Sequence, residues 1–298
     1  MATDDSTDAS HRSGAAQSSS PTARRIILGA RLRRLREAAE ISRAEAGYAI
    51  RGSESKISRL ELGRVSFKPR DVTDLLTMYG VTDVEEREVF LGLVKASNEP
   101  GWWHRYTDLV ADWFQDYLGL EESASRIQTF EVQFLPGLMQ TEDYAKAIAT
   151  RGWSQLASQR ADRQVAVRIR RQELLARPDA PQLWAIIDES VLHRPIGGRR
   201  VMLAQIEHLL ELTKRPNITL QIVPYPLSGY AAEGSFTMLR FAEPELPNVV
   251  YIEYLSGALY LDRQSETELY GRAFDRLTVD AKTPDHSRQL LAKVRAEI

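Results

Sequence analysis

Few residues of this 298-residue chain could perform covalent or metal chemistry. The sequence contains no cysteine, which excludes disulfides, thiol catalysis and thiolate metal sites. None of the histidines forms an HExxH motif or another pair at ligand spacing; they are His11, His104, His193, His208 and His286. A metal site would need carboxylates brought together by folding. We therefore expect no metal ion and no other cofactor.

One carboxylate pair has a spacing that acid–base chemistry could use. Asp188 and Glu189 end the predicted strand in LWAIIDESV. Such a pair more often caps the helix that follows. The chain has no GxSxG, P-loop or GxGxxG motif, and Ala46-Gly47, the early Ala-Gly that a self-cleaving repressor would need, lies inside a predicted helix. We expect the protein not to be an enzyme.

The stretch SESKISRLELGR (Ser53–Arg64) points to a different chemistry, the reading of nucleic-acid bases. On a helical wheel its sparse apolar residues share one side with Glu61, whereas Ser55, Ser58 and Arg59 lie opposite, flanked by Glu54 and Lys56. Arg and Lys pair with guanine edges in the major groove, and Ser permits close approach to phosphate or base. The alternative is an ordinary solvated helix face.

The charge distribution favours the first interpretation. Between Arg24 and Arg70 there are 13 Lys and Arg residues against 5 Asp and Glu residues, a local charge of +8. The net charge of the chain is −2, so all other residues together carry −10. A compact basic segment on an acidic chain is typical of a nucleic-acid-binding module. A solvated arginine-rich helix is the alternative.

Five predicted helices position this segment in a domain spanning residues 24–97. The first begins near Ile26; the second runs from the Ser42/Glu45 capping box to about Ile50; the third is capped by Ser53 and ends at Gly63. Two more helices follow, with apolar faces within 72–79 and 89–94. Residues 1–23 are Ser/Ala/Asp-rich and are predicted to form a disordered arm.

Residues 98–298 are predicted to form an α+β domain with a small, mostly antiparallel sheet. Short β-branched and aromatic runs, among them ITLQIVPY, SFTMLRFA, NVVYIEYL and ALYLD, alternate with Gly/Pro/Asn turns. Residues 102–120 are predicted to form one aromatic-rich helix, and 155–177 a long arginine-rich helix. The chain is thus predicted to be a multi-domain protein, all-α at the N-terminus.

Residues 42–63 resemble the helix-turn-helix of the xenobiotic-response-element family, relatives of the lambda-type repressors. The matching features are Ser42, Glu45, Ile50, Ser53 and the ISRLELG core. Ala46-Gly47 replaces the usual Leu-Ala, and the turn glycine comes one place late, with Arg51 in its slot. The interpretation predicts operator binding, usually by a homodimer. Its DNA-binding residues are Ser42, Arg43, Ser53, Glu54, Ser55, Lys56, Ser58, Arg59 and Arg64.

The C-terminal part, with its motifs GWWHRY, FLPGLMQTEDYAKA, VVYIEY and ALYLD, resembles WhiJ-like actinobacterial regulators. Some members of that group are antitoxin-like and sit beside genes for small acidic partner proteins. The resemblance implies that a small acidic protein controls this regulator through the C-terminal domain, which would also mediate dimerisation. The alternative is a one-component regulator whose C-terminal domain senses a small-molecule ligand.

An aromatic group near the start of the second domain is the candidate ligand or partner site. Its candidate residues are Trp102, Trp103, Tyr106, Trp113 and Tyr117, with Phe114 beside them. Core packing is the ordinary explanation for such a group, and an apolar pocket is the alternative. The six arginines between Arg160 and Arg177 could extend a DNA footprint or form a solvated or inter-subunit face.

Hydropathy gives the expected location. No apolar run approaches about 18 residues, the length of a membrane span, and the polar N-terminus has no signal-peptide core. We expect a cytoplasmic protein that does not contact a membrane.

Overall fold

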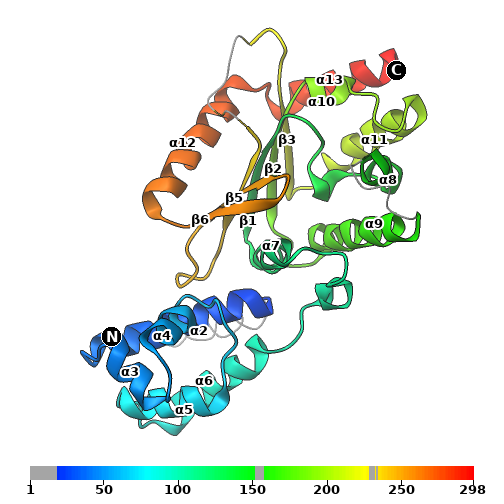
Figure 1. The fold of residues 1–298 in the computed structure, drawn as a ribbon. Coiled ribbons are helices and arrows are strands. Elements are labelled where there is room, and N and C mark those ends of the chain that lie inside the picture. The colour runs from blue at the N-terminus through cyan, green and yellow to red at the C-terminus, as the bar shows by residue number, and fades with distance from the viewer. Residues whose placement is uncertain (1–18, 152–157, 228–231, 233) are drawn as a thin grey trace. The chain divides into compact units, whose positions relative to one another are not determined.

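The computed structural model describes residues 19–151, 158–227, 232 and 234–298, and Figure 1 shows their arrangement. The chain divides into two compact units. The first contains the chain up to His104 together with Ala242–Leu246, and the second contains Arg105–Phe241 and Pro247–Ile298. The sequence predicts a boundary at 97/98. Residues 1–18, most of the predicted arm, lie outside the described residues.

The described part of the first unit contains five helices. They are α2 (Pro21–Ala38), α3 (Arg43–Ala49), α4 (Glu54–Glu61), α5 (Pro69–Met78) and α6 (Val84–Ser97). Helix α2 begins earlier than Ile26 because Ser20 caps it, accepting a hydrogen bond from the Ala23 amide (3.2 Å), and because Pro21 suits the first helical turn. Apolar residues from all five helices pack into one core, which includes Leu32, Ile57 and Leu76.

The second unit is built on a six-stranded mixed sheet with the order β3-β2-β1-β4-β5-β6. The strands are β1 (Arg126–Glu131), β2 (Gln182–Asp188), β3 (Ile218–Val223), β4 (Phe236–Arg240), β5 (Val249–Tyr254) and β6 (Gly257–Leu261). Strands β1, β2 and β3 are mutually parallel, and the pairs β1–β4, β4–β5 and β5–β6 are antiparallel.

The prediction of a small, mostly antiparallel sheet is therefore wrong. Parallel neighbours need a crossover connection, and helices lie between β1 and β2 and between β2 and β3. The sequence places those helices between the strands, but short apolar runs do not show which strands pair. The sheet forms from two parallel crossovers and one antiparallel meander.

Helices cover both faces of this sheet. They are α7 (Asp112–Ser123), α8 (Glu142–Arg151), α9 (Ser158–Gln172), α10 (Ser190–His193), α11 (Arg199–Leu212), α12 (Gln264–Asp280) and α13 (Pro284–Glu297). Figure 1 shows α12 on one face and α7, α8, α9 and α11 on the other. On the α12 face, Phe274 and Leu277 pack against Phe130, Phe236 and Val250 of the strands.

The single helix predicted for 102–120 is wrong. A 3-10 helix, η1 (Trp102–Tyr106), is followed by a turn, and α7 begins only at Asp112. The predicted 155–177 helix is α9 followed by the 3-10 helix η3 (Glu173–Ala176), and residues 152–157 lie outside the described residues. The aromatic residues of the first segment therefore do not share one helical face.

Candidate functional sites

Helices α3 and α4 form a tight helix-turn-helix. The predicted capping box is present: the Glu45 amide donates to Ser42 Oγ (3.2 Å), and Glu45 Oε2 accepts from the Ser42 amide (2.8 Å). At the start of α4, Ser53 Oγ accepts from the Lys56 amide (3.2 Å), as predicted. These caps satisfy amides that a helix start leaves unpaired and fix where both helices begin.

Two departures from the usual motif have structural explanations. Gly47 is buried against the turn, and a Cβ placed there would lie 2.9 Å from the Ser53 carbonyl carbon, so only glycine permits this approach. Arg51 has φ of +54°, the left-handed conformation that glycine usually supplies at this turn. The motif therefore packs more closely than usual at Gly47 and has a strained backbone at Arg51.

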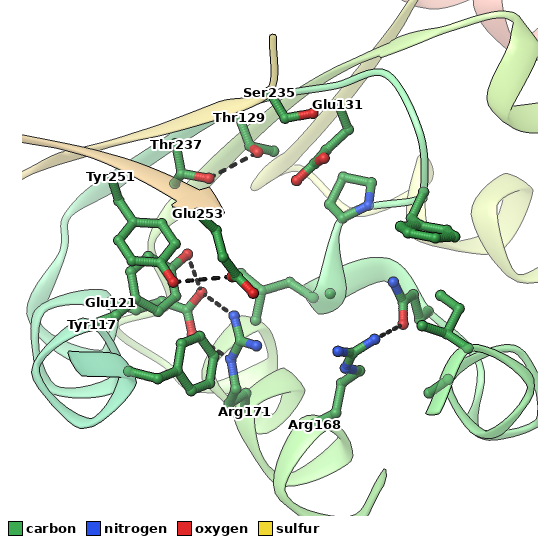
Figure 2. Close-up of a pocket in the computed structure, with 18 of the residues that line it drawn as sticks. Tyr117, Glu121, Thr129, Glu131, Arg168, Arg171, Ser235, Thr237, Tyr251 and Glu253 are labelled. Atoms are coloured by element: carbon green, nitrogen blue, oxygen red, sulfur yellow. Dashed lines mark hydrogen bonds and ion pairs between the residues drawn. The ribbon is translucent and has the colours of Figure 1, made fainter. Parts of the chain in front are cut away.

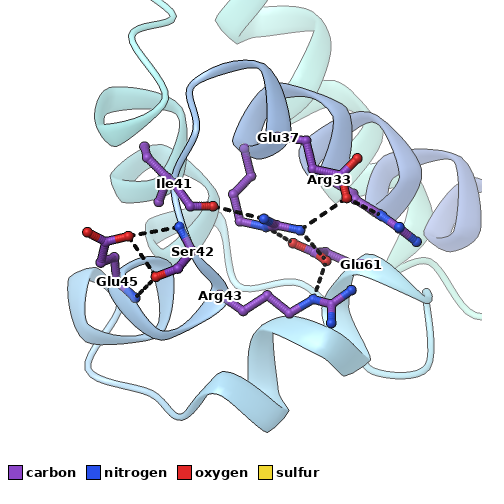
Figure 3. Close-up of polar contacts among 8 residues, drawn as sticks. Arg33, Glu37, Ile41, Ser42, Arg43, Glu45 and Glu61 are labelled. Carbon is purple, nitrogen blue, oxygen red and sulfur yellow. Dashed lines mark hydrogen bonds and ion pairs between the residues drawn. The ribbon is translucent and has the colours of Figure 1, made fainter.

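The inward face of α4 is held by burial and by charge. Ile57 and Leu60 are buried in the core, and beside them Glu61 is buried as well. Arg36 of α2 donates to both Glu61 carboxylate oxygens, through Nε (2.5 Å) and Nη2 (3.2 Å), and to the Ile41 carbonyl (2.8 Å). Figure 3 shows this arrangement.

Arg43 of α3 completes the cluster, because its Nε donates to Glu61 Oε2 at 3.1 Å. One carboxylate on α4 thus joins α2, α3 and α4. The wheel places Glu61 on the inner side of α4 but gives no partner for it, and no local spacing links Arg36 to a residue 25 positions away. Arg43, one of the predicted DNA-binding residues, is half-exposed and also has this structural contact.

The outward face of α4 carries most of the predicted DNA-binding residues. Ser53, Glu54, Ser55 and Arg59 are exposed, and Ser58 is half-buried. Within the described residues Arg59 forms no ion pair; its Nε lies 3.4 Å from the Ser55 carbonyl oxygen. Among the described residues, the face therefore presents one exposed guanidinium without a carboxylate partner, surrounded by short polar side chains.

The remaining predicted residues lie at the margins of this face. Lys56 is half-buried, and its Nζ lies 2.6 Å from Asp71 Oδ2 on α5. Ser42 is exposed at the start of α3, and Arg64 is exposed just after α4 ends. Of the two cations predicted to read bases, Arg59 is thus available and Lys56 is engaged within the domain.

The second unit contains a cavity of about 780 Å³ between the sheet and the helices on one of its faces. Strands β1, β4 and β5, helices α7, α8 and α9, and the 132–140 segment line it. Its walls include Phe114, Leu135, Leu138, Ile148 and Val165, together with several charged groups. Figure 2 shows the charged groups projecting into the hollow. The volume lies in the range typical of small-molecule sites.

One end of the cavity is a closed cluster around Arg171. Its guanidinium donates to both oxygens of Glu121 (2.9 and 2.8 Å), and Tyr117 donates to Glu121 Oε1 (2.8 Å). The guanidinium carbon also lies 5.1 Å from the Phe114 ring centroid. Burial opposes the charge of Arg171, but Glu121 outweighs it and raises the arginine pKa. This pair is internally neutralised.

The other polar groups of the cavity are less completely paired. Arg168 of α9 donates from Nη1 to Gln140 Oε1 (2.7 Å), and burial lowers its pKa to about 10. Glu131, at the end of β1, has a pKa that burial raises to about 7; Ser235 donates to it, and neighbouring Glu253 adds to the increase. Glu253 on β5 accepts from the Tyr251 hydroxyl at 3.0 Å.

The predicted aromatic site is divided by the structure. Trp113 and Tyr117 line the cavity, with Phe114 between them. Trp102 and Trp103 belong to the first unit, and Tyr106 is absent from the lining. No spacing in the sequence indicates Glu131 or Glu253, and Arg168 is predicted only as a member of the arginine run, because strands and helices far apart in the chain bring the three together.

The acidic pair and the arginine run have structural contacts. Asp188 Oδ1 accepts from the Ser190 amide (2.9 Å) at the start of α10, and Glu189 Oε2 accepts from the Tyr225 amide (2.9 Å). Asp188 thus bonds the first turn of α10, whereas Glu189 does not cap that helix and instead bonds the segment after β3. In the arginine run, Arg163 and Arg177 pair with Asp108 and Glu122 within the second unit.

Among the described residues, no group of three or more His, Asp or Glu side chains is arranged to hold a metal ion. In the same part of the chain, every helix is too short or too polar to span a membrane.

Two family models match the chain. Residues 27–90 match a helix-turn-helix domain. Residues 114–293 match a domain of unknown function, DUF5753. No curated protein and no solved structure matches.

Proposed function

This chain belongs to the DUF5753 family, and we propose that it is a transcription regulator that reads operator DNA with helix α4. The N-terminal part is a helix-turn-helix domain, which is a DNA-binding module. The observation that carries the assignment of α4 is the difference between its two faces. Its inner face is fixed by Ile57, Leu60 and the Glu61 cluster. Its outer face presents Ser55 and the exposed guanidinium of Arg59, which has no carboxylate partner among the described residues.

The proposal assigns separate roles to the DNA-binding residues. Ser55 and Arg59 face base edges, with Glu54, Ser58 and Lys56 beside them. The residues around the two helix starts and after α4 contact phosphate and fix the register on the duplex; they are Ser42, Arg43, Ser53 and Arg64. For Lys56, base contact requires release of its ion pair with Asp71.

The experiment measures affinity for an operator enriched from a random duplex pool. Arg59→Ala is expected to weaken specific binding by about 1–3 kcal/mol if the guanidinium makes a bidentate base contact, and Lys56→Ala by a similar amount if it does. Arg295→Ala, an exposed arginine on α13, is the matched control and is expected to leave affinity unchanged. Wild-type affinity in both α4 variants, by fluorescence anisotropy, would contradict the assignment.

We further propose that the protein acts as a homodimer held through the second domain, without catalysis. A single small helix-turn-helix reads only a few base pairs, so specificity usually needs two modules on a two-fold site. Half-sites about one helical turn apart are expected. A monomeric mass by light scattering, both free and on DNA, would refute this proposal.

Control of the regulator is proposed to act through the second domain, by a small acidic partner protein. Such a partner changes DNA affinity only if it binds the DNA-competent and incompetent states differently, and operator DNA must then change partner affinity by the same factor. The test titrates the small protein encoded beside this gene, with and without operator. If the affinity for the partner is the same with and without operator DNA, the partner does not control DNA binding, and this proposal is contradicted.

A second candidate function is sensing of a small molecule. One observation favours it, the cavity lined by Trp113, Tyr117, Glu131 and Arg168. A packed interaction platform needs no hollow of this size with charged groups in its walls.

A further inference from the structure

We propose that the second-domain cavity binds a zwitterionic organic molecule, with its carboxylate on Arg168, its protonated amine between Glu131 and Glu253, and its apolar body against the Phe114 wall. The proposal rests on the second candidate function, sensing of a small molecule. It adds the class of ligand and the residues that would recognise it.

Arg168 lies at the end of the cavity that would bind the carboxylate of the ligand. A guanidinium has five N–H donors, and the protein uses one of them, the Nη1 bond to Gln140. Within the described ranges no carboxylate lies at ion-pair distance from Arg168, and none of its nitrogens is both buried and without a hydrogen-bond partner. Because Arg168 lines the cavity, its remaining donors are accessible there. A planar fork of donors matches a carboxylate.

The sheet provides the opposite end. Residues two apart on a strand share a face, so Glu131 lies on the same side of the sheet as Thr129, which pairs across the ladder with Thr237 and then Tyr251. The next level of this face carries Glu131, Ser235 and Glu253, all of which line the cavity. Figure 2 shows Glu131 and Ser235 together on the sheet side and Arg168 projecting from α9.

The balance of charge selects a zwitterion. Arg171 and Glu121 cancel each other in a bidentate pair. Among the described lining residues, what remains is one cation, Arg168, and two carboxyls, Glu131 and Glu253, of which Glu131 is partly protonated near neutral pH. These three side chains together therefore carry a charge between zero and −1. A ligand with one carboxylate and one amine satisfies both ends without leaving a buried charge unpaired.

The rim of the cavity indicates that the bound molecule also has an apolar part. Leu255 in the β5–β6 turn lines the cavity yet is 91% exposed, and Tyr254 beside it is 51% exposed. Large apolar side chains at the mouth of a hollow are covered when an apolar body enters it. The volume of about 780 Å³ suits a body larger than one amino acid.

The test uses full-length protein and the dipeptide phenylalanyl-leucine as the probe. Two blocked forms are the ligand-side controls: the N-acetyl form lacks the amine, and the C-terminal amide lacks the carboxylate. Calorimetry is expected to show that the free dipeptide binds at least about tenfold more tightly than either blocked form. Quenching of tryptophan fluorescence, from Trp113 in the cavity wall, is the second readout.

Protein variants locate the two ends. Arg168→Met is expected to lower the affinity for the free dipeptide at least about tenfold. It is expected to leave the affinity for the amide unchanged, because the amide has no carboxylate for Arg168 to bind. Glu131→Gln is expected to lower the affinity for the free dipeptide and to leave the affinity for the N-acetyl form unchanged. Arg163→Met is the matched control on the same helix; Arg163 is exposed and does not line the cavity.

Several results would overturn the proposal. They are equal affinity for free and blocked dipeptides, no binding of any form below about 10 mM, or equal weakening of the amide by Arg168→Met. The ligand-side comparison uses wild-type protein, so it decides even if a variant fails to fold. A separate titration with operator DNA measures sensing. If a blocked form binds tightly and changes the affinity for operator, the proposed sensing function stands, and the proposal of a zwitterionic ligand is contradicted.

Discussion

Replacing Glu61 by glutamine tests whether the buried charge cluster positions the DNA-reading helix. Glu61→Gln keeps the shape of the side chain and one acceptor oxygen but removes the charge that Arg36 faces. The two side chains are only 4% and 8% exposed, so water cannot replace the lost carboxylate. The hydrogen bond to Glu61 raises the pKa of Arg36. A guanidinium stays protonated near neutral pH even without that bond, so the variant leaves a charged Arg36 buried.

The magnitude follows from burial. Breaking one side of a buried ion pair costs about 3–5 kcal/mol, because an uncompensated charge remains inside. A small domain has about 5–15 kcal/mol of stability, so Glu61→Gln is expected to remove a large share of it. Asp74→Asn is the matched control: Asp74 pairs with Arg70 on α5, the two side chains are 39% and 71% exposed, and its loss is expected to cost less than about 1 kcal/mol.

Native-state hydrogen exchange on peptides from α2 and α4 measures the free energy of opening of this domain alone. Protection in the second unit is the internal reference. Replacing both partners, Arg36→Met with Glu61→Leu, is expected to recover most of the lost stability, because no charge is then left buried. A loss below about 1 kcal/mol in Glu61→Gln, or a double variant no better than the single one, would refute the reasoning.

Three further substitutions have expected outcomes. Arg51→Gly is expected to raise first-domain stability by up to about 1 kcal/mol, measured by urea unfolding, since glycine accepts φ of +54° without strain; a decrease would contradict strain at this turn. Gly29→Ala is expected to lower stability by about 1–3 kcal/mol and to weaken operator binding, because the new Cβ would lie 2.4 Å from the Leu60 carbonyl oxygen, whereas Gly92→Ala has no such contact and is the control. In Glu131→Gln, stability relative to wild type is expected to rise between about pH 5 and 8, by at most about 3 kcal/mol. The folded-state pKa of Glu131 is raised to about 7, so the stability that protonation provides is complete below the ordinary value and is lost as pH rises through 7; a flat difference in urea midpoints would contradict it.

The sequence by itself determined the helix-turn-helix, because its determinants are local. The Ser42/Glu45 capping box, the Ser53 cap and the stop at Gly63 act over three or four residues, so their spacing in the chain is their spacing in space. The outward position of Arg59 follows in the same way from the helical period.

The tertiary structure decided everything that depends on distant segments meeting. The sequence indicates strands β2 to β6 but not how they pair, because pairing depends on the route of the chain between strands and not on strand composition. The Arg36–Glu61 contact spans 25 positions, and the cavity joins Glu131 of β1, Arg168 of α9 and Glu253 of β5. Their charges become specific only where folding removes water around them, and no spacing in the sequence records that burial.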